Sequence, residues 1–519
     1  MLPLIRLFVL ATLAATPLLQ AAPAMLDAAA ARHLLVRTGF APTQQEVDAL
    51  TGQSAQRAVG ELLVRAQAAK PRQPPPAFVS QPPPGRIADL KDRDAIIAAR
   101  REQLREGLEL KNWWLGEMLT TPTPLAERMT LFWHNHFATS QQKVVRSQVM
   151  WQQHQLLRTN ALGNFRTLLH AVAKDPALLV YLDAANSRKD APNENFAREV
   201  MELFTLGEAT QGQGATAAYS ERDVKEVARA LTGWSIDRDT FTFKFRPFFH
   251  DSGSKTVLGR TGNFDGDAVL DVLLDQPTAA RFITTKLWRE FVSPQPQPQA
   301  AERIAARFKQ SGWDISVVMR ELLLCDEFWA EANRGSLIKS PVDLVVGTVR
   351  QFGFVSPNTL PFTLKTAQLG QNLLVPPNVK GWPGQNDWIN STTLLGRKQF
   401  TEQLLKATPD TLAAREGMMR RMKEEFASGG GRGSPQQAVA MLGKEGALLL
   451  ADSIAKTNFD AAAWLAAYGA KPDSVPSDDA QTRMAQALLA VPPTQTIAAG
   501  TVGLAYLRGL TQDPAYQLK

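Results

Sequence analysis

The chain has 519 residues, of which 44% are hydrophobic and 21% are charged. Its 34 Gly and 33 Pro are close to the background of globular proteins, which excludes collagen-like and low-complexity polymers. Its 11 Trp and 24 Phe can fill a core, which argues against wholesale disorder. A chain of this length is expected to form two or three globular units, and the formal net charge of +7 favours anionic partners without naming a ligand.

The first 24 residues have the pattern of a secretory signal peptide. Arg6 precedes an apolar stretch from Leu7 to Leu19, and Ala22-Pro23-Ala24 offers a cleavage site. The apolar stretch is shorter than the roughly 20 residues that a spanning helix needs. We therefore predict a signal peptide over residues 1–24 and a periplasmic or secreted protein without stable membrane insertion.

Helical periodicity dominates the rest of the chain, so the sequence predicts a mainly α fold with one large multi-helical domain and long Pro-rich loops. Capping signals support this interpretation, since Thr43 with Glu46 and Ser220 with Asp223 both fit capping boxes. The clearest predicted helices are 92–119, 125–134, 148–158, 165–172, 195–206, 221–231, 267–274 and 279–291.

One segment departs from helical periodicity. Phe241, Phe243 and Phe245 alternate with polar residues, a period of two that is typical of a half-buried strand. We therefore predict a minor β-strand or hairpin insertion near 240–260.

Composition also divides the chain. The predicted main helical domain covers 25–427 and includes a Pro-rich wrap at 69–86 without a helix of its own. A Gly-rich linker at 428–434 then leads to a small helical C-terminal unit at 435–519. Residues 375–391 are loop-like throughout, and their two Trp side chains either stack on a sugar ring or pack into the core.

The densest polar cluster in an apolar setting is LFWHNHFATS, which contains His134 and His136. Two His residues two apart share a face on a strand and can bind one metal there, whereas on a helix they point about 200° apart. The preceding pattern is helical, so the pair is expected at a helix end. Either both residues are metal ligands, or both are buried structural histidines near a helix C-terminus.

A second cluster, NENFAREVMELFTLG, places Glu199 and Glu202 three residues apart on one helix face. Two carboxylates there can bind a hard cation or act as general base and acid. In the alternative interpretation Glu194 pairs with Arg198, and the other acids are solvated or paired with Arg.

His250 and Asp251 follow the predicted strand, in a loop position that often carries function. The nearby GSKT lacks the complete phosphate-loop pattern, which excludes a nucleotide site of that kind. The basic residues are scattered without an aromatic-interleaved stripe, so we expect no nucleic-acid partner.

Seven blocks resemble the large bacterial domain-of-unknown-function family numbered eighteen hundred, in order from about His33 to Arg397. The blocks are RHLLVRTGFAPT, ERMTLFWHNHF, NENFAREVMELFTLG, RDVKEVARALTGW, HDSGSKTVLG, LIKSPVDLVVG and PPNVKGWPG. The resemblance implies an exported bacterial protein, often encoded beside a second exported family that is similar to sulfatases and alkaline phosphatases. It implies no activity.

Two hypotheses follow. In the first, the protein is an exported metal-dependent hydrolase of a cell-envelope or extracellular substrate, and Zn, Mn or Fe would suit its ligands. His134 and His136 would bind the ion, Glu199 or Glu202 would serve as ligand or base, and His250 and Asp251 would lie at the rim. In the second, the protein is a non-catalytic binding or assembly module that works with an exported sulfatase-like partner, and the polar clusters are buried networks that fix the fold.

Overall fold

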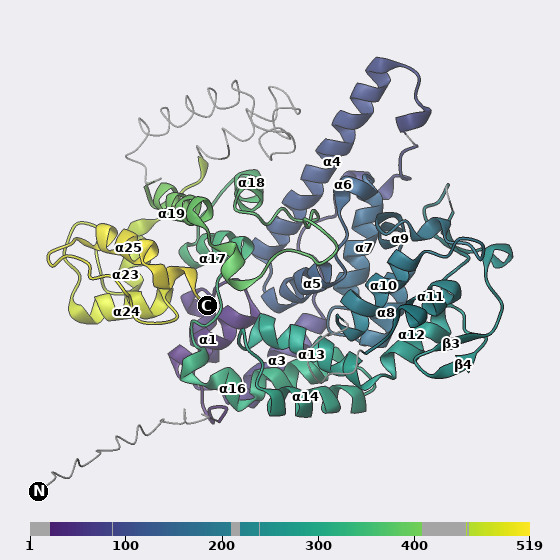
Figure 1. Cartoon of the computed structure of the whole chain (residues 1–519). Coiled ribbons are helices and arrows are strands. Elements are labelled where there is room, and N and C mark those ends of the chain that lie inside the picture. The colour runs from purple at the N-terminus through teal and green to yellow at the C-terminus, as the bar shows by residue number, and fades with distance from the viewer. Residues whose placement is uncertain (1–20, 86, 209–217, 238, 407–452, 454–455) are drawn as a thin grey trace, which may run out of the picture.

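The computed structural model describes residues 21–406, except 86, 209–217 and 238, and also 453 and 456–519 (Figure 1). Most of the predicted signal peptide and the whole predicted linker 428–434 lie outside the described residues. Within the described part the fold is mainly helical with two small two-stranded sheets, which confirms the predicted class.

The helices of the first half are α1 (Ala28–Thr38), α2 (Gln44–Leu50), α3 (Ala55–Gln67), α4 (Arg93–Thr120), α5 (Pro124–His136), α6 (Gln141–Val144), α7 (Ser147–Thr159), α8 (Phe165–Ala173), α9 (Pro176–Tyr181), α10 (Glu194–Met201) and α11 (Glu221–Ala230). The π-helix η4 (Glu202–Leu206) continues α10. Short 3₁₀ turns are η1 (Ala77–Ser80), η2 (Ile87–Asp89) and η3 (Ala184–Asn186).

The second half contains α12 (Gly266–Leu274), α13 (Pro277–Phe291), α14 (Pro298–Gln310), α15 (Ile315–Leu324), α16 (Asp326–Trp329), α17 (Pro341–Phe352), α18 (Leu360–Gln368), α19 (Ser391–Lys406), α23 (Ala461–Ala467), α24 (Asp478–Leu488) and α25 (Gly503–Gln512). Its 3₁₀ turns are η5 (Pro247–Phe249), η6 (Glu331–Asn333), η7 (Gln385–Trp388) and η9 (Pro514–Gln517). No helix of the described residues is long and apolar enough to cross a membrane.

Local sequence signals account for the helix starts. Both predicted capping boxes are present, at the starts of α2 and α11. In each, the side chain of the N-cap residue accepts the backbone N–H three residues later, and the acidic side chain of that later residue accepts the backbone N–H of the N-cap. The long helix α4 begins after Asp92, whose carboxylate accepts the backbone N–H of Ala95. In Figure 1 one end of α4 projects from the rest of the molecule.

The predicted β insertion is present as two hairpins. Strand β1 (Trp234–Ile236) pairs antiparallel with β2 (Phe243–Phe245), and β3 (Lys255–Val257) pairs with β4 (Arg260–Gly262). The expected burial of alternate Phe side chains is wrong in part. Phe241 precedes the strand with a left-handed backbone at φ 51°, and Phe245 is 42% exposed, because a two-stranded sheet gives each strand little to pack against.

The Pro-rich segments are less extended than predicted. The wrap at 69–86 contains the 3₁₀ turn η1, which presses Phe78 into the core, and 375–391 contains η7. Trp382 and Trp388 are buried in the core at 5% and 6% exposure, which favours packing over stacking on a sugar.

The buried apolar residues form two clusters. The larger one joins α1–α3 with α8 and α10–α16, and the other joins α4, α17–α19 and the C-terminal helices α23–α25. Helix α5 contributes to both, since Met129 packs into the first cluster and Leu131 into the second. Its last turn therefore lies at the boundary between the two cores.

Candidate functional site

Helix α5 ends at the two predicted metal ligands. His134 and His136 occupy its last turn and are 2% and 3% exposed. They face different neighbours, as two helical residues two apart must. The structure therefore does not bring the two imidazoles together.

His134 lies in an aromatic enclosure. Its ring centroid is 5.6 Å from that of Trp114 and 5.5 Å from that of Trp382, and Trp114 also packs against His154. The Nε2 atoms of His134 and His154 are buried without a hydrogen-bond partner among the described residues. Burial lowers the pKa of His134 to about 3, so this imidazole is neutral.

His136 is bonded at both ring nitrogens. Nε2 lies 3.2 Å from the carbonyl oxygen of Phe204, and Nδ1 lies 3.0 Å from Nζ of Lys286 on α13. Because a carbonyl only accepts, Nε2 carries the proton, and Nδ1 accepts from the lysine. Burial, together with the charge of Lys286, holds the pKa of His136 well below its usual value.

Lys286 is half-buried. Burial, helped by the nearby charge of Arg289, lowers the pKa of Lys286 to about 8. An amine with that pKa exchanges a proton near neutral pH, which an ordinary lysine does not. The pair His136–Lys286 is therefore the most chemically competent group at this end of α5.

The carbonyl that orients His136 belongs to the π-helix η4. The hydroxyl of Thr205 donates to the carbonyl of Val200, five residues earlier, at 2.7 Å, and approaches that of Met201 at 3.2 Å. Gly207 ends the π-helix with φ +88°, where a Cβ would lie 3.0 Å from the ring of Phe282. Such π-helical turns are frequent at functional sites.

The loop after α18 crosses the end of α5. The backbone N–H of Trp382 donates to Oδ1 of Asn135 at 2.7 Å. Gly381, with φ +90°, allows this approach, because a Cβ there would lie 2.2 Å from the same oxygen. Lys380 then reaches Glu208 just beyond the π-helix at 2.7 Å.

The two predicted carboxylates border this loop. Glu199 and Glu202 are half-buried near each other, and the charge of Lys380 acts on Glu199. Burial, and then the charge of Glu202, raises the pKa of Glu199. The alternative pairing of Glu194 with Arg198 is wrong, because Arg198 pairs with Glu221 on α11 at 2.7 Å.

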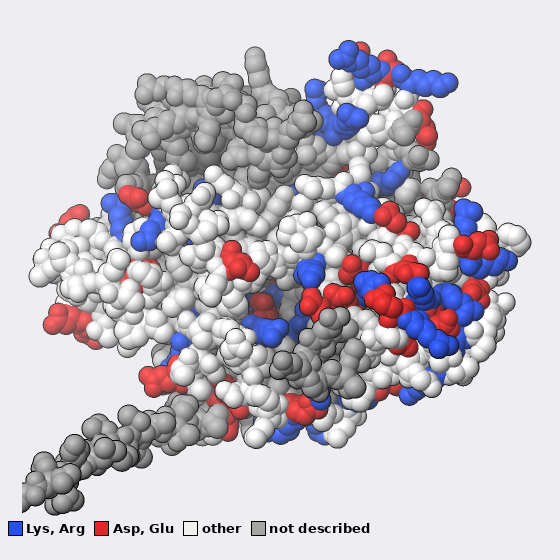
Figure 2. Space-filling model, viewed as in Figure 1, with Lys and Arg blue, Asp and Glu red and all other residues white. Residues whose placement is uncertain are grey.

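Figure 2, in the view of Figure 1, shows a hollow near the middle of this face, between the positions of α5 and α13. Basic and acidic side chains gather around it. A ligand with polar or charged groups can approach this face of the molecule at the hollow.

His250 and Asp251 hold a different part of the molecule together. Nδ1 of His250 lies 2.9 Å from the carbonyl of Thr232, and Asp251 forms an ion pair with Arg229 on α11 at 2.7 Å. Nζ of Lys255 donates to the carbonyl of Asp251. These contacts fasten the β3–β4 hairpin to α11, and none of them involves α5 or η4.

Among the described residues no group of three or more His, Cys, Asp or Glu side chains is placed to hold a metal ion. Both nitrogens of His136 are already bonded, and His134 faces aromatic rings. The described side chains therefore do not form a preassembled site for Zn, Mn or Fe, and we derive no step through a metal.

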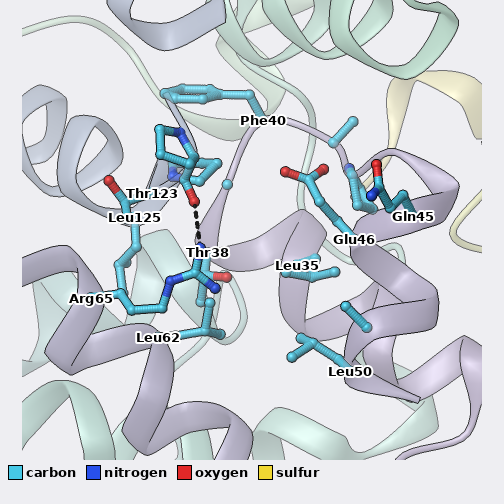
Figure 3. A pocket seen from close by; sticks show the side chains of 16 residues that line it. Leu35, Thr38, Phe40, Gln45, Glu46, Leu50, Leu62, Arg65, Thr123 and Leu125 are labelled. Atoms are coloured by element: carbon cyan, nitrogen blue, oxygen red, sulfur yellow. Dashed lines mark hydrogen bonds between the residues drawn. The ribbon is translucent and has the colours of Figure 1, made fainter. Parts of the chain in front are cut away.

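Two cavities lie away from these residues. One of about 250 Å³ lies between α1, α2 and α3 (Figure 3), where Arg65 reaches over to the carbonyl of Pro122 at 3.3 Å. The other, of about 990 Å³, lies between the Pro-rich wrap and helices α4, α17 and α18. Glu46 lines both, but its carboxylate already bonds Thr43 and Arg350. Neither cavity is lined by a predicted site residue.

Sequence reasoning missed the lysine at the centre of this site. Lys286 lies in an ordinary amphipathic helix, RFITTKLWREF, and only the fold shows that it meets His136. Lys380 was easier to find, because it lies in the block PPNVKGWPG.

A family model described as a protein of unknown function, DUF1800, matches residues 33–517. The chain therefore belongs to this family, which confirms the resemblance and extends it towards the C-terminus. No curated protein and no solved structure matches the chain.

Proposed function

We propose that this member of the DUF1800 family is an exported hydrolase that uses acid–base chemistry at the junction of α5, η4 and α13. The observation that carries the proposal is the hydrogen bond between half-buried Lys286 and neutral His136, because it places a lysine of lowered pKa against an imidazole that can hold it in position. Export is proposed on the signal-peptide pattern of residues 1–24.

In this proposal Lys286 is the group that transfers protons. The ammonium form donates a proton to the leaving group as its bond to the substrate breaks, water adds to the substrate in place of the leaving group, and the amine takes up the proton that this water loses. His136 positions Lys286, since the imidazole accepts one N–H of the lysine while Phe204 fixes the ring. Glu199, with its raised pKa, would supply a second acid–base group, and the charge of Lys380 acts on it from the loop that crosses the end of α5.

The substrate class follows from charge. Lys286 and Arg289 form no ion pair among the described residues, and these two cations would attract a substrate with anionic groups. We therefore propose an anionic substrate of the cell envelope or the extracellular medium, such as an acidic polysaccharide or an ester of an inorganic acid.

The test is a hydrolase screen of the purified mature protein with phosphate, sulfate, carboxylate and glycoside esters. Lys286→Met should abolish any activity found, and Lys286→Arg should shift its pH profile upward, because an Arg guanidinium stays protonated. Lys225→Met, on the exposed face of α11, is the matched control and should leave activity unchanged. Full activity in Lys286→Met would overturn the assignment of this lysine.

A second candidate is the non-catalytic binding or assembly module with an exported sulfatase-like partner. The observation that favours it is that His134, His250 and Asp251 pack against or bond other parts of the fold. Co-purification from the periplasm tests this candidate, and a lone monomer without a recovered partner would contradict it.

A further inference from the structure

A second charged cluster lies where α5, α13, α17, α19 and the C-terminal segment meet. It contains five cationic side chains that are at most 7% exposed: Arg37, Arg128, Lys339, Arg397 and Lys519. Only two carboxylates act on these charges among the described residues, buried Asp343 and Glu290, which is 35% exposed. The side chains of this cluster therefore carry more positive than negative charge.

Asp343 is the centre of the cluster. Its two oxygens accept from Arg128 Nη1 at 2.5 Å and from Lys519 Nζ at 2.7 Å. Burial alone would raise the pKa of Asp343, but the charges of Arg128 and Lys519 outweigh it and hold the pKa below the usual value. This carboxylate is therefore fully used by two cations, and little of its charge remains for the other three.

Two arginines have donors without a hydrogen-bond partner on the same edge of the guanidinium. Arg128 bonds Asp343 through Nη1, and Arg397 bonds the carbonyl of Lys339 and Oε1 of Gln517 through Nη1. In both residues Nε and Nη2 are buried without a hydrogen-bond partner among the described residues, although Glu290 lies 3.5 Å from Nη2 of Arg128. The Nε–Nη2 edge is the fork that binds two oxygens of an oxyanion side by side.

Other atoms of the cluster also lack hydrogen-bond or charge partners. Nε2 of Gln517 and Nε of Arg37 are also buried donors without a partner in the described part of the chain. Lys339 contacts the face of the Tyr516 ring at 4.0 Å and no described carboxylate. Because a buried unpaired charge or donor costs several kcal/mol, so many of them together require a compensating group.

We propose that this cluster binds a small oxyanion, with the Nε–Nη2 edges of Arg128 and Arg397 as its donors and with Lys339 and Lys519 as charge partners. The ligand is a phosphate, a sulfate or a carboxylate group, since these present the paired oxygens that a guanidinium fork takes. Burial lowers the pKa of Lys339 to about 7, and a bound anion would raise it again. The inference does not depend on catalysis at Lys286.

Glu290 is the most exposed acid of the cluster and lies on α13 one turn after Lys286. It lies 3.5 Å from Nη2 of Arg128 and 3.8 Å from Nζ of Lys519, so the solvent-facing side of the cluster is at this side chain.

Thermal unfolding in phosphate, sulfate, acetate and chloride at one ionic strength tests the proposal. We expect one oxyanion to raise the melting temperature of the wild type by about 3 °C over chloride. The three oxyanion arms distinguish a tetrahedral anion from a carboxylate. Arg397→Lys keeps the charge but removes the fork, so it should abolish this rise, whereas Lys225→Met should keep it.

Lys339→Met provides a second variant for the case in which Arg397→Lys does not fold. Without oxyanion it should melt at or above the wild-type temperature, because it removes an uncompensated buried charge, and it should respond less to the anion. Ion chromatography of desalted, denatured wild type should also release an oxyanion that is held tightly. Equal melting of the wild type in all four salts, or an oxyanion response as large as that of the wild type in both cluster variants, would overturn the site.

Discussion

Lys286 and Glu290 lie one turn apart on the same face of α13, and each meets a different residue of α5. Lys286 bonds His136, in the last turn of α5, and Glu290 lies 3.5 Å from Arg128, two turns earlier. Because later residues of α5 meet earlier residues of α13, the two helices run antiparallel along this face. One helix face therefore connects the proposed catalytic lysine with the buried cationic cluster.

The pH dependence of stability should report the pKa of Lys286. Between about pH 8 and 10.5 the unfolded chain binds a proton at this lysine that the folded chain has lost, so the free energy of unfolding rises with pH. Urea unfolding of the wild type and Lys286→Met at pH 7 to 10 should show this rise only in the wild type. Lys380→Met is the control, since Lys380 is exposed and paired with Glu208. Parallel curves for wild type and Lys286→Met would contradict the lowered pKa.

His134→Ala should destabilise the protein without affecting metal content. The substitution leaves a cavity beside Trp114 and Trp382, which we expect to cost about 3 kcal/mol. Between pH 6.5 and about 3 the imidazole of His134 is protonated in the unfolded chain but stays neutral in the folded chain. The free energy of unfolding of the wild type therefore falls as the pH is lowered through this range, and the variant lacks this pH-dependent loss.

Urea unfolding and elemental analysis of both proteins check this prediction. Stoichiometric metal in the wild type that disappears in a folded variant would instead restore His134 as a ligand.

Asp175→Asn should stabilise the protein at neutral pH. Asp175 is buried, accepts from Gln153 Nε2 at 2.8 Å and caps α9, and burial raises its pKa to about 7. Between about pH 3.8 and 7 the folded chain binds a proton that the unfolded chain has lost, so stability falls as pH rises. Asparagine keeps the accepting oxygen and removes the charge. Melting temperatures from pH 4 to 8 should therefore decline less in the variant, and an equal decline in both proteins would refute this account.

Asp343→Asn should be strongly destabilising, by about 3 to 5 kcal/mol, because it leaves Arg128 and Lys519 without their buried carboxylate. Adding Lys519→Met should recover part of the loss, since it removes one of the uncompensated cations. A double-mutant cycle in urea measures this coupling. Additive losses would show that the two residues do not form an interacting pair.

The resemblance of seven ordered blocks already identified the family, and the family model extends the match to residue 517. Several of these blocks contain the charged residues that matter, since Arg128 lies in ERMTLFWHNHF and both Lys339 and Asp343 lie in LIKSPVDLVVG. Membership of a block marked these segments, but it could not say which side chains meet, because the partners in the pairs Arg128–Asp343 and His136–Lys286 are 150 or more residues apart.

The sequence by itself determined the helical class, the position of the β insertion, the capping boxes of α2 and α11 and the presence of a helix end near the His134–His136 pair. These features depend on periodicity and on contacts between residues three or four apart. Only the tertiary structure decided that His134 faces tryptophans, that His136 meets Lys286 and that His250 and Asp251 fasten a hairpin. Burial and distant neighbours set the chemistry of a titratable side chain, and both arise only when the helices pack.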